Sequence, residues 1–186
     1  MGKIVVTEFV SLDGVMEDPG GAEDFKYGGW TFEIPRGEGD RFKLDETMAS
    51  DALLLGRVTY EGFAASWSTR EGEFADAFNK MPKYVASRTL TETTWNATLL
   101  EGDVAEEVAR LKEQPGRNIV KYGTGELDRT LVEHGLVDEF HLWYFPVIVG
   151  AGKHLFEGAG FDTTHLKLAD ISRFDSGIVI HVYVPR

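Results

Sequence analysis

Short apolar runs alternate along this chain with amphipathic stretches, and the alternation predicts an α/β protein. Residues 3–10 (KIVVTEFV) are mostly β-branched and aromatic up to the turn at Asp13 and Gly14, which predicts a buried first strand. The segment 71–81 instead carries apolar side chains at positions i, i+3, i+4 and i+7, and Pro82 follows it. This spacing predicts an amphipathic helix that ends before the proline.

The other apolar segments divide between the same two periodicities. Strands are predicted at 3–10, 52–56, 83–88, 117–122, 137–149, 165–174 and 178–184. Helices are predicted at 40–50, from Arg57 onward, at 71–81, at 103–113 and at 127–134. The predicted order is strand, long loop, helix, strand, two helices, two strands, helix, strand, helix and three strands. We therefore expect a mostly parallel sheet covered by helices, with antiparallel strands at the C-terminal end.

Single residues mark several of the predicted ends. Asp40 is placed as the N-cap of the first helix, and Gly135 as the residue that ends the helix at 127–134. Pro146 falls inside the predicted strand 137–149, where it marks a bulge or an edge strand.

The segment 17–39 is too long for an ordinary connection, and it holds six Gly, two Pro and six acidic residues. It also carries Trp30 and Phe32, and bulky aromatic side chains in a glycine-rich loop need a surface to cover. We expect a lid or binding loop here, with a flexible surface insertion as the alternative.

Composition narrows the classes of function. The 186 residues include 19 basic and 31 acidic side chains, a net charge of −12, which argues against a nucleic-acid or anionic-membrane partner. The absence of cysteine excludes disulfides, a cysteine nucleophile and thiolate metal sites, and it is compatible with a reducing compartment. No apolar run approaches about 18 residues. We expect one domain over 1–186, no signal peptide and a cytoplasmic location.

Three loops that follow predicted strands carry the candidate binding residues, because ligands of open α/β sheets bind beyond the carboxyl ends of the strands. The first, 56–59 (GRVT), opens a helix whose free N–H groups, together with the Arg57 guanidinium and the Thr59 hydroxyl, suit an anion. The alternative is a helix cap with a solvent-exposed arginine.

The second loop, 87–89 (SRT), sets an arginine between two hydroxyls and suits a phosphate monoester. The third, 122–127 (YGTGEL), runs from strand through Gly-x-Gly to helix, a geometry that cradles a pyrophosphate, although it lacks the third glycine of the dinucleotide fingerprint. The five histidines show no i, i+4 pair, so no metal site is predicted.

Four segments in this order resemble the dihydrofolate-reductase-like superfamily, and most closely the C-terminal reductase domain of the bacterial riboflavin-pathway deaminase-reductase. The segments are LLLGRVTYE (53–61), KYVASRTL (83–90), VKYGTGEL (120–127) and GLVDEFHLWYFPVIVGAGKHLF (135–156). The resemblance covers residues 3–184. It implies a three-layer α/β/α fold that binds NADPH along the strand exits and delivers hydride to a small pyrimidine- or pterin-like heterocycle.

The resemblance also implies roles for individual residues. Those carried over as cofactor-binding are Val10, Ser11, Gly56, Arg57, Thr59, Ser87, Arg88, Tyr122, Gly123, Thr124, Gly125, Glu126 and Leu127. Ser87 and Arg88 are assigned to the 2′-phosphate end of NADPH. Asp13 and Trp30 are assigned to the substrate, with Trp30 excluding water above the reacting ring.

Asp40 is the candidate proton relay. It precedes Gly56 by 16 residues (56 − 40), about where folate reductases place the acid that faces the pterin. Helical geometry puts it on the face of Leu44 and Met48, and an apolar site would raise the pKa of its carboxyl. Its role as an N-cap is the alternative, and Asp13 is the competing acid.

Three functions stay open at this point. The leading hypothesis is an NADPH-dependent reductase of a small heterocycle. A true dihydrofolate reductase is the second, although 17–39 lacks the Met-Pro-Trp segment of those enzymes. A nucleotide-binding module without catalysis is the third. A homodimer is also expected, because Trp143, Phe145 and Val147 alternate along one strand and would leave an apolar face outside the core.

Overall fold

The computed structural model describes residues 2–186, which form one mixed sheet of eight strands. The strands are β1 (Ile4–Ser11), β2 (Ser50–Gly56), β3 (Lys83–Ala86), β4 (Ala97–Leu99), β5 (Asn118–Tyr122), β6 (Glu139–Phe145), β7 (Leu166–Arg173) and β8 (Val179–Pro185). Their order in the sheet is β4-β3-β2-β5-β1-β6-β8-β7. Within the described residues, β8 alone runs antiparallel to its neighbours, β6 and β7. The predicted parallel sheet with an antiparallel C-terminal end is confirmed.

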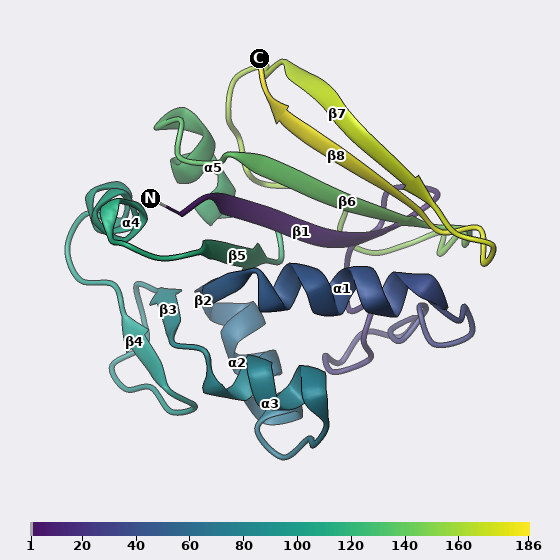
Figure 1. The fold of residues 1–186 in the computed structure, drawn as a ribbon, viewed down its shortest axis with the longest axis horizontal. Coiled ribbons are helices and arrows are strands. Elements are labelled where there is room, and N and C mark those ends of the chain that lie inside the picture. Colours follow the sequence, from purple (N-terminus) through teal and green to yellow (C-terminus); the bar gives the residue numbers. More distant parts are fainter. Residues whose placement is uncertain (1) are drawn as a thin grey trace.

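Helices cover both faces of this sheet. They are α1 (Glu38–Met48), α2 (Arg57–Trp67), α3 (Glu73–Lys80), α4 (Val104–Glu113) and α5 (Glu126–Glu133). Ile4 of β1 packs in one core layer with Val108 of α4 and Leu131 of α5. The opposite face packs against α1, α2 and α3, and Figure 1 shows α1 crossing in front of the sheet. The result is a three-layer α/β/α arrangement.

The predicted element order is confirmed, and the main differences lie at element ends. The second strand of the middle pair is β4, a strand of three residues whose position the apolar pattern did not give. The strand predicted at 137–149 ends at Phe145, just before Pro146, so the proline marks neither a bulge nor an edge. β6 lies inside the sheet between β1 and β8. A proline cannot donate to the ladder, so pairing stops there.

The N-cap predicted at Asp40 is wrong. Gly37 occupies the N-cap position of α1, and Asp40 lies within the first turn, where its carboxylate pairs with Arg36 at 2.7 Å. Gly37 has a φ of 55° and a ψ of −123°, a conformation that favours glycine, and the helix begins directly after it, three residues earlier than predicted. An acid in the first turn still suits the helix dipole.

The segment 17–37 is a folded loop held by its own hydrogen bonds. The buried carboxylate of Asp18 accepts from the backbone N–H of Ala22 at 2.7 Å and of Glu23 at 3.0 Å. The Trp30 indole donates to the Glu17 carbonyl at 2.8 Å and packs edge-on against Phe145. These contacts argue against a flexible insertion, and whether the loop moves as a lid stays a prediction.

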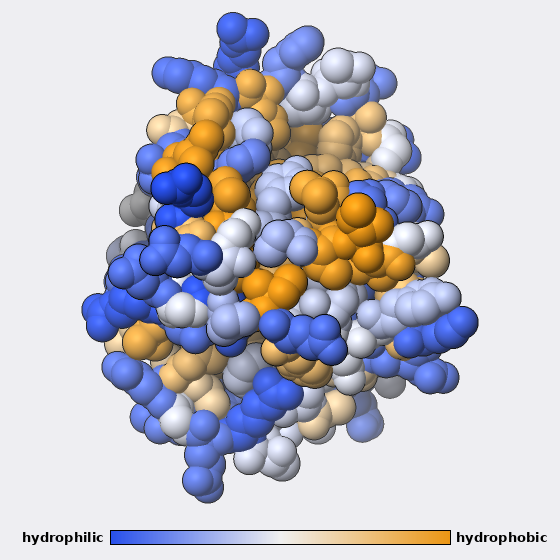
Figure 2. All heavy atoms as spheres, turned by 90° about the vertical axis from the view of Figure 1, so that its right-hand side faces the viewer, coloured by the Kyte–Doolittle hydropathy of each residue, from blue (hydrophilic) through white to orange (hydrophobic). Residues whose placement is uncertain are grey.

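The apolar face that predicted a homodimer is covered. Trp143 and Phe145 are fully buried, because Phe42 of α1 and Trp30 of the loop pack over them. Exposed apolar side chains lie elsewhere, among them Leu12, Phe32 and Ile148. Figure 2 shows hydrophobic side chains at the surface of the face that it presents. The homodimer therefore stays an untested prediction without its original support, and light scattering of the purified protein will test it.

No helix within residues 2–186 is both long enough and apolar enough to span a bilayer.

Candidate active site

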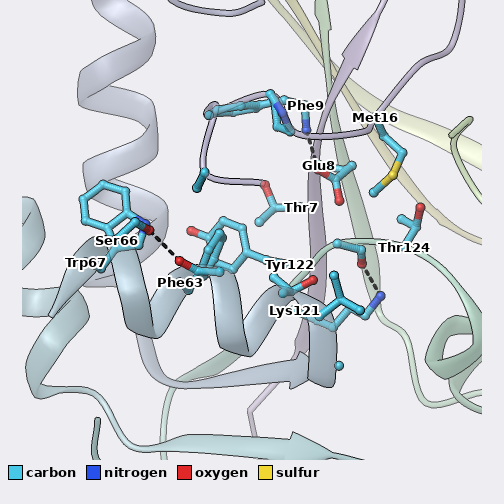
Figure 3. Close-up of a pocket in the computed structure, with 18 of the residues that line it drawn as sticks. Thr7, Glu8, Phe9, Met16, Phe63, Ser66, Trp67, Lys121, Tyr122 and Thr124 are labelled. Carbon is cyan, nitrogen blue, oxygen red and sulfur yellow. Dashed lines mark hydrogen bonds between the residues drawn. The ribbon is translucent and has the colours of Figure 1, made fainter. Parts of the chain in front are cut away.

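A cleft with a volume of about 1590 Å³ lies at the carboxyl ends of β1, β2, β3 and β5. β1 and β5 are neighbours in the sheet, but the chain leaves β1 toward α1 on one face and leaves β5 toward α5 on the other. Chains that diverge in this way leave a crevice between them, which is where open α/β sheets bind ligands. Figure 3 shows side chains of β1, α2 and the β5–α5 turn around this cleft.

The β5–α5 turn brings bare backbone to the cleft. Gly123 has a φ of 72°, and a Cβ at this position would overlap the Thr59 hydroxyl from the start of α2. The Asp128 carboxylate accepts from the Gly125 N–H at 2.6 Å, which fixes the start of α5. The first turn of a helix presents N–H groups that the helix itself cannot satisfy. Loops 56–59 and 122–127 therefore meet as one surface suited to an anion.

Gly123→Ala is expected to destabilise the fold and to weaken any ligand of this turn by tenfold or more, because the new methyl group must displace Thr59. Gly135→Ala is the matched control, since Gly135 has a similar φ of 61° and open space around it. The control should lose only about 1 kcal/mol of stability, the cost of the backbone conformation. Thermal unfolding compares the two, and equal losses would contradict a close approach at Gly123.

Two arginines lie along the rim of the cleft. Arg57 pairs with Glu61 at 2.8 Å, one turn along α2. Arg88, which is 80% exposed, pairs with Glu126 at the start of α5. Ser87 is a turn-forming residue, because its hydroxyl accepts from the N–H groups of Thr89 and Leu90. Exposed pairs of this kind are weak, so both guanidinium groups can exchange their partner for a ligand phosphate.

A chain of polar side chains is buried between α1 and the sheet. The Lys43 ammonium donates to the Thr7 hydroxyl at 2.8 Å and to the Glu46 carboxylate at 2.6 Å. The other Glu46 oxygen lies 2.6 Å from Nδ1 of His141, and Nε2 of His141 lies 3.1 Å from Glu139. Thr7 and His141 are register partners on β1 and β6, so the sheet itself aligns this chain.

Burial and neighbouring charges act in opposite directions on the pKa values of these buried side chains. Burial lowers the pKa of Lys43 despite the nearby Glu46 carboxylate. Burial works to raise the pKa of Glu46, but Lys43 and His141 outweigh it and the pKa is lowered. Burial likewise works to lower the pKa of His141, and its bonds to Glu46 and Glu139 leave that pKa raised. The Lys43 ammonium also lies 4.6 Å from the centre of the Tyr122 ring, so a cation lines the cleft wall.

A second buried polar group lies on the opposite face of the sheet. Lys121 of β5 and Asp128 of α5 form an ion pair of 2.5 Å with both side chains fully buried, and Lys121 also donates to the Gly123 carbonyl. Glu8 of β1 is 6% exposed beside them. Burial raises the pKa of Glu8 to about 7, against the opposing charge of Lys121.

The sequence of this chain matches the model of a known protein family. The model of the RibD C-terminal domain matches residues 2–180. The chain belongs to the RibD C-terminal domain family. A relative of similar length is the uncharacterized protein YyaP of Bacillus subtilis. It is 32% identical to this chain, and the match covers 97% of this chain and 94% of YyaP.

Solved structures share the fold of this RibD C-terminal domain. A putative riboflavin biosynthesis protein from Shewanella sp. PV-4 has a TM-score of 0.76 at 20% identity, with 99% of each chain covered. A deaminase/5-amino-6-(5-phosphoribosylamino)uracil reductase from Thermotoga maritima has a TM-score of 0.60 at 14% identity, and the match covers all of this chain and 57% of that one. Dihydrofolate reductase from Enterococcus faecalis has a TM-score of 0.63 at 13% identity, covering 100% and 97%. The dihydrofolate-reductase-like fold is confirmed.

The cleft of this RibD C-terminal domain brings most of the predicted site residues together. Those that line it are Asp40, Gly56, Arg57, Thr59, Ser87, Arg88, Tyr122, Gly123, Thr124, Gly125, Glu126 and Leu127. Their roles stay predictions, since the lining shows only where the side chains lie. Asp40 sits at the rim with its side chain 62% exposed, because α1 turns Lys43 rather than Asp40 toward the sheet.

Four predicted site residues lie outside the cleft lining. Val10 and Ser11 are buried under the turn after β1. Asp13 accepts from the Ser11 hydroxyl and from the N–H groups of Val149 and Gly150, which lowers its pKa to about 2. Trp30 packs on β6. The cleft is bordered instead by Thr7, Glu8 and Phe9, which directly precede Val10 on β1.

Sequence reasoning missed the buried charges of the cleft. Glu8 and Lys121 each interrupt an otherwise apolar strand, and Lys43 lies in a helix with no clear apolar face. A charge inside a buried strand is itself a signal, because Lys and Glu are almost never fully buried unless paired.

Within residues 2–186, no group of three or more His, Asp or Glu side chains is arranged to hold a metal ion.

Proposed function

We propose that this protein is an NADPH-dependent reductase that transfers hydride to a small pyrimidine- or pterin-like heterocycle. The observation that carries the proposal is the cleft at the β1/β5 divergence, where a bare glycine turn, a helix N-terminus and two weakly paired arginines face one space. Membership of the RibD C-terminal domain family supports it. The Thermotoga structure, named as a reductase, supports it at the level of the fold.

The residues present fit a dinucleotide. A Cβ at Gly123 would collide with the Thr59 hydroxyl, so the glycine lets Thr59 approach the backbone of the turn that would face a pyrophosphate. Arg57 and Thr59 would hold the phosphates from the α2 side, and Arg88 would exchange Glu126 for the 2′-phosphate. The nicotinamide supplies the hydride when it is bound. The chain binds and orients the partners, and Phe9 and the 17–37 loop exclude water from the inner end.

The first test is binding. Quenching of the four tryptophans by NADPH, checked by calorimetry, should saturate in the micromolar range. Oxidation of NADPH is then followed with dihydrofolate and with 5-amino-6-(5-phosphoribosylamino)uracil. Consumption of dihydrofolate alone would favour a folate reductase, which the shared fold with the Enterococcus enzyme keeps in view. Binding without oxidation would favour a non-catalytic module, and no binding would refute the proposal.

Arg88→Ala is expected to weaken NADPH binding roughly 10- to 100-fold and NADH binding much less, because a charge-assisted bond to the 2′-phosphate is lost. Arg57→Ala is the matched variant and should weaken both dinucleotides alike. Dissociation constants for the two nucleotides with each variant check this. Equal losses of NADPH and NADH in Arg88→Ala would contradict the assignment of that residue.

A further inference from the structure

The carboxyl group of Glu8 is buried in the cleft wall with half of its hydrogen-bonding capacity unused. It is 6% exposed and lines the cleft. Oε1 accepts from the backbone N–H of Phe9 at 3.1 Å, whereas Oε2 has no hydrogen-bond partner within residues 2–186. A buried polar atom left unpaired is unfavourable, so such an atom calls for a functional explanation.

The register of the sheet places Glu8 at the inner end of the cleft. Thr7 of β1 pairs with Tyr122, the last residue of β5, so Glu8 is one residue beyond the end of its neighbouring strand. On the β5 side Glu8 therefore lies beside the glycine turn that follows that strand, whereas on its other side it is the register partner of Leu142 of β6. Figure 3 shows Glu8 next to the cleft together with Thr7, Phe9 and Met16.

Neighbouring charges do not neutralise Glu8. Lys121 of β5 is the main cation that acts on it, but its ammonium bonds to Asp128 of α5 and to the Gly123 carbonyl. Lys43 of α1 acts from the other face of the sheet and is bonded to Glu46. Asp128 adds a like charge. Burial outweighs these charges and raises the pKa of Glu8 to about 7, so a proton is available on this group at neutral pH.

We infer that Glu8 is the acid of the reaction, with its carboxyl group donating a proton to the nitrogen of the C=N bond that is reduced in the substrate bound in the cleft. This inference rests on the proposed function. The carbon of the substrate C=N bond receives the hydride of the reduced nicotinamide dinucleotide, and the π electrons move onto nitrogen. That nitrogen takes the proton from Glu8, which becomes a carboxylate and regains a proton from water. The substrate is reduced by two electrons and the dinucleotide is oxidised.

The rival acid, Asp40, has the opposite environment. Its side chain is 62% exposed, and its carboxylate is bonded to Arg36 at 2.7 Å. Exposure to water and a direct bond to a guanidinium distinguish this carboxylate from the buried carboxyl of Glu8. Burial thus separates the two candidates, and a pair of conservative substitutions tests them against each other.

Glu8→Gln keeps the shape of the side chain and removes its ionisable proton. The substrate for this test is whichever of dihydrofolate and 5-amino-6-(5-phosphoribosylamino)uracil the wild-type protein reduces. We expect kcat of the variant to fall about 10²- to 10⁴-fold while its Kd for NADPH stays within about twofold. Wild-type kcat should decline as pH rises through about 7, and this decline should be absent from the residual activity of Glu8→Gln. Asp40→Asn should retain the wild-type pH profile.

A titration of the carboxyl resonances complements the kinetic measurements. In protein labelled with ¹³C at the glutamate carboxyl, one resonance should titrate near pH 7 and be missing from Glu8→Gln. Titration of that resonance near the ordinary value of 4.5, full activity of Glu8→Gln, or loss of the pH dependence in Asp40→Asn alone would each overturn the inference. A wild-type protein that binds no NADPH refutes the proposed function, and the proton step with it, whereas loss of the Glu8 effects alone leaves the reductase standing.

Discussion

Asp128→Ala is expected to lower the free energy of unfolding by about 3–5 kcal/mol, the largest stability effect among the substitutions considered. Asp128 and its partner Lys121 are both fully buried, and their charged atoms lie 2.5 Å apart. Removal of the carboxylate leaves the Lys121 ammonium in the interior with the Gly123 carbonyl as its one remaining hydrogen-bond acceptor within residues 2–186. It also removes the acceptor of the Gly125 N–H, which begins α5.

The matched control is Glu133→Ala on the same helix. Glu133 pairs with Arg129 at 2.9 Å, but both side chains are about half exposed, so its loss should cost under about 1 kcal/mol. Urea unfolding followed by circular dichroism measures both variants. Similar losses in the two variants would show that water reaches the Lys121 ammonium and would contradict the burial of the pair. Because the pair anchors the glycine turn, Asp128→Ala should also weaken NADPH binding.

Glu8→Gln is expected to stabilise the protein at alkaline pH, by roughly 3 kcal/mol at pH 8.5. The folded pKa of Glu8, about 7, lies above the ordinary value of 4.5. The folded protein therefore holds this proton more tightly than the unfolded chain does. The resulting stability is fully present below about pH 4.5 and is lost as pH rises through 7, where the buried carboxyl must ionise. A neutral glutamine avoids that loss.

His141 contributes a pH dependence of the same sign. Its folded pKa is raised above 6.5, so the stability from its bonds to Glu46 and Glu139 is present below pH 6.5 and is lost as pH rises through the folded pKa. Wild-type stability should therefore fall between pH 6 and 8.5, and Glu8→Gln should remove part of the fall. Unfolding free energies at both pH values check this. A Glu8→Gln protein that is less stable than wild type at pH 8.5 would show that the ionised carboxylate is held by Lys121.

A residue whose ionised form destabilises the fold is more readily explained by function than by packing. Active sites often retain groups that are unfavourable for stability, and replacing them stabilises the protein while activity is lost. Gain of stability together with loss of kcat in one variant would distinguish Glu8 from the structural acids Glu46 and Asp128, whose substitution should reduce stability.

Local patterns predicted the fold well because its strands and helices are locally consistent. Apolar strands such as 52–56 and 117–122 and the helix before Pro82 are visible from periodicity and breaker residues alone. Strand 97–99 was not located, since three residues carry no period. Asp40 was assigned to the inner face of α1 because Leu44 and Met48 share its spacing. The buried face of α1 is in fact polar, made of Gly39, Lys43, Glu46 and Thr47, so hydrophobic spacing indicated the wrong side.

The sequence by itself determined the order of the elements, the parallel sheet and the three loops at its carboxyl edge, because turns and periodicities depend on neighbouring residues. Only the tertiary structure decided which charges are buried together. Glu8 lies more than a hundred residues before Lys121 and Asp128 in the chain, and a shift of one residue in a strand would turn its side chain to the other face. Burial and pairing are properties of that register, and they are what sets the proton affinity of the cleft.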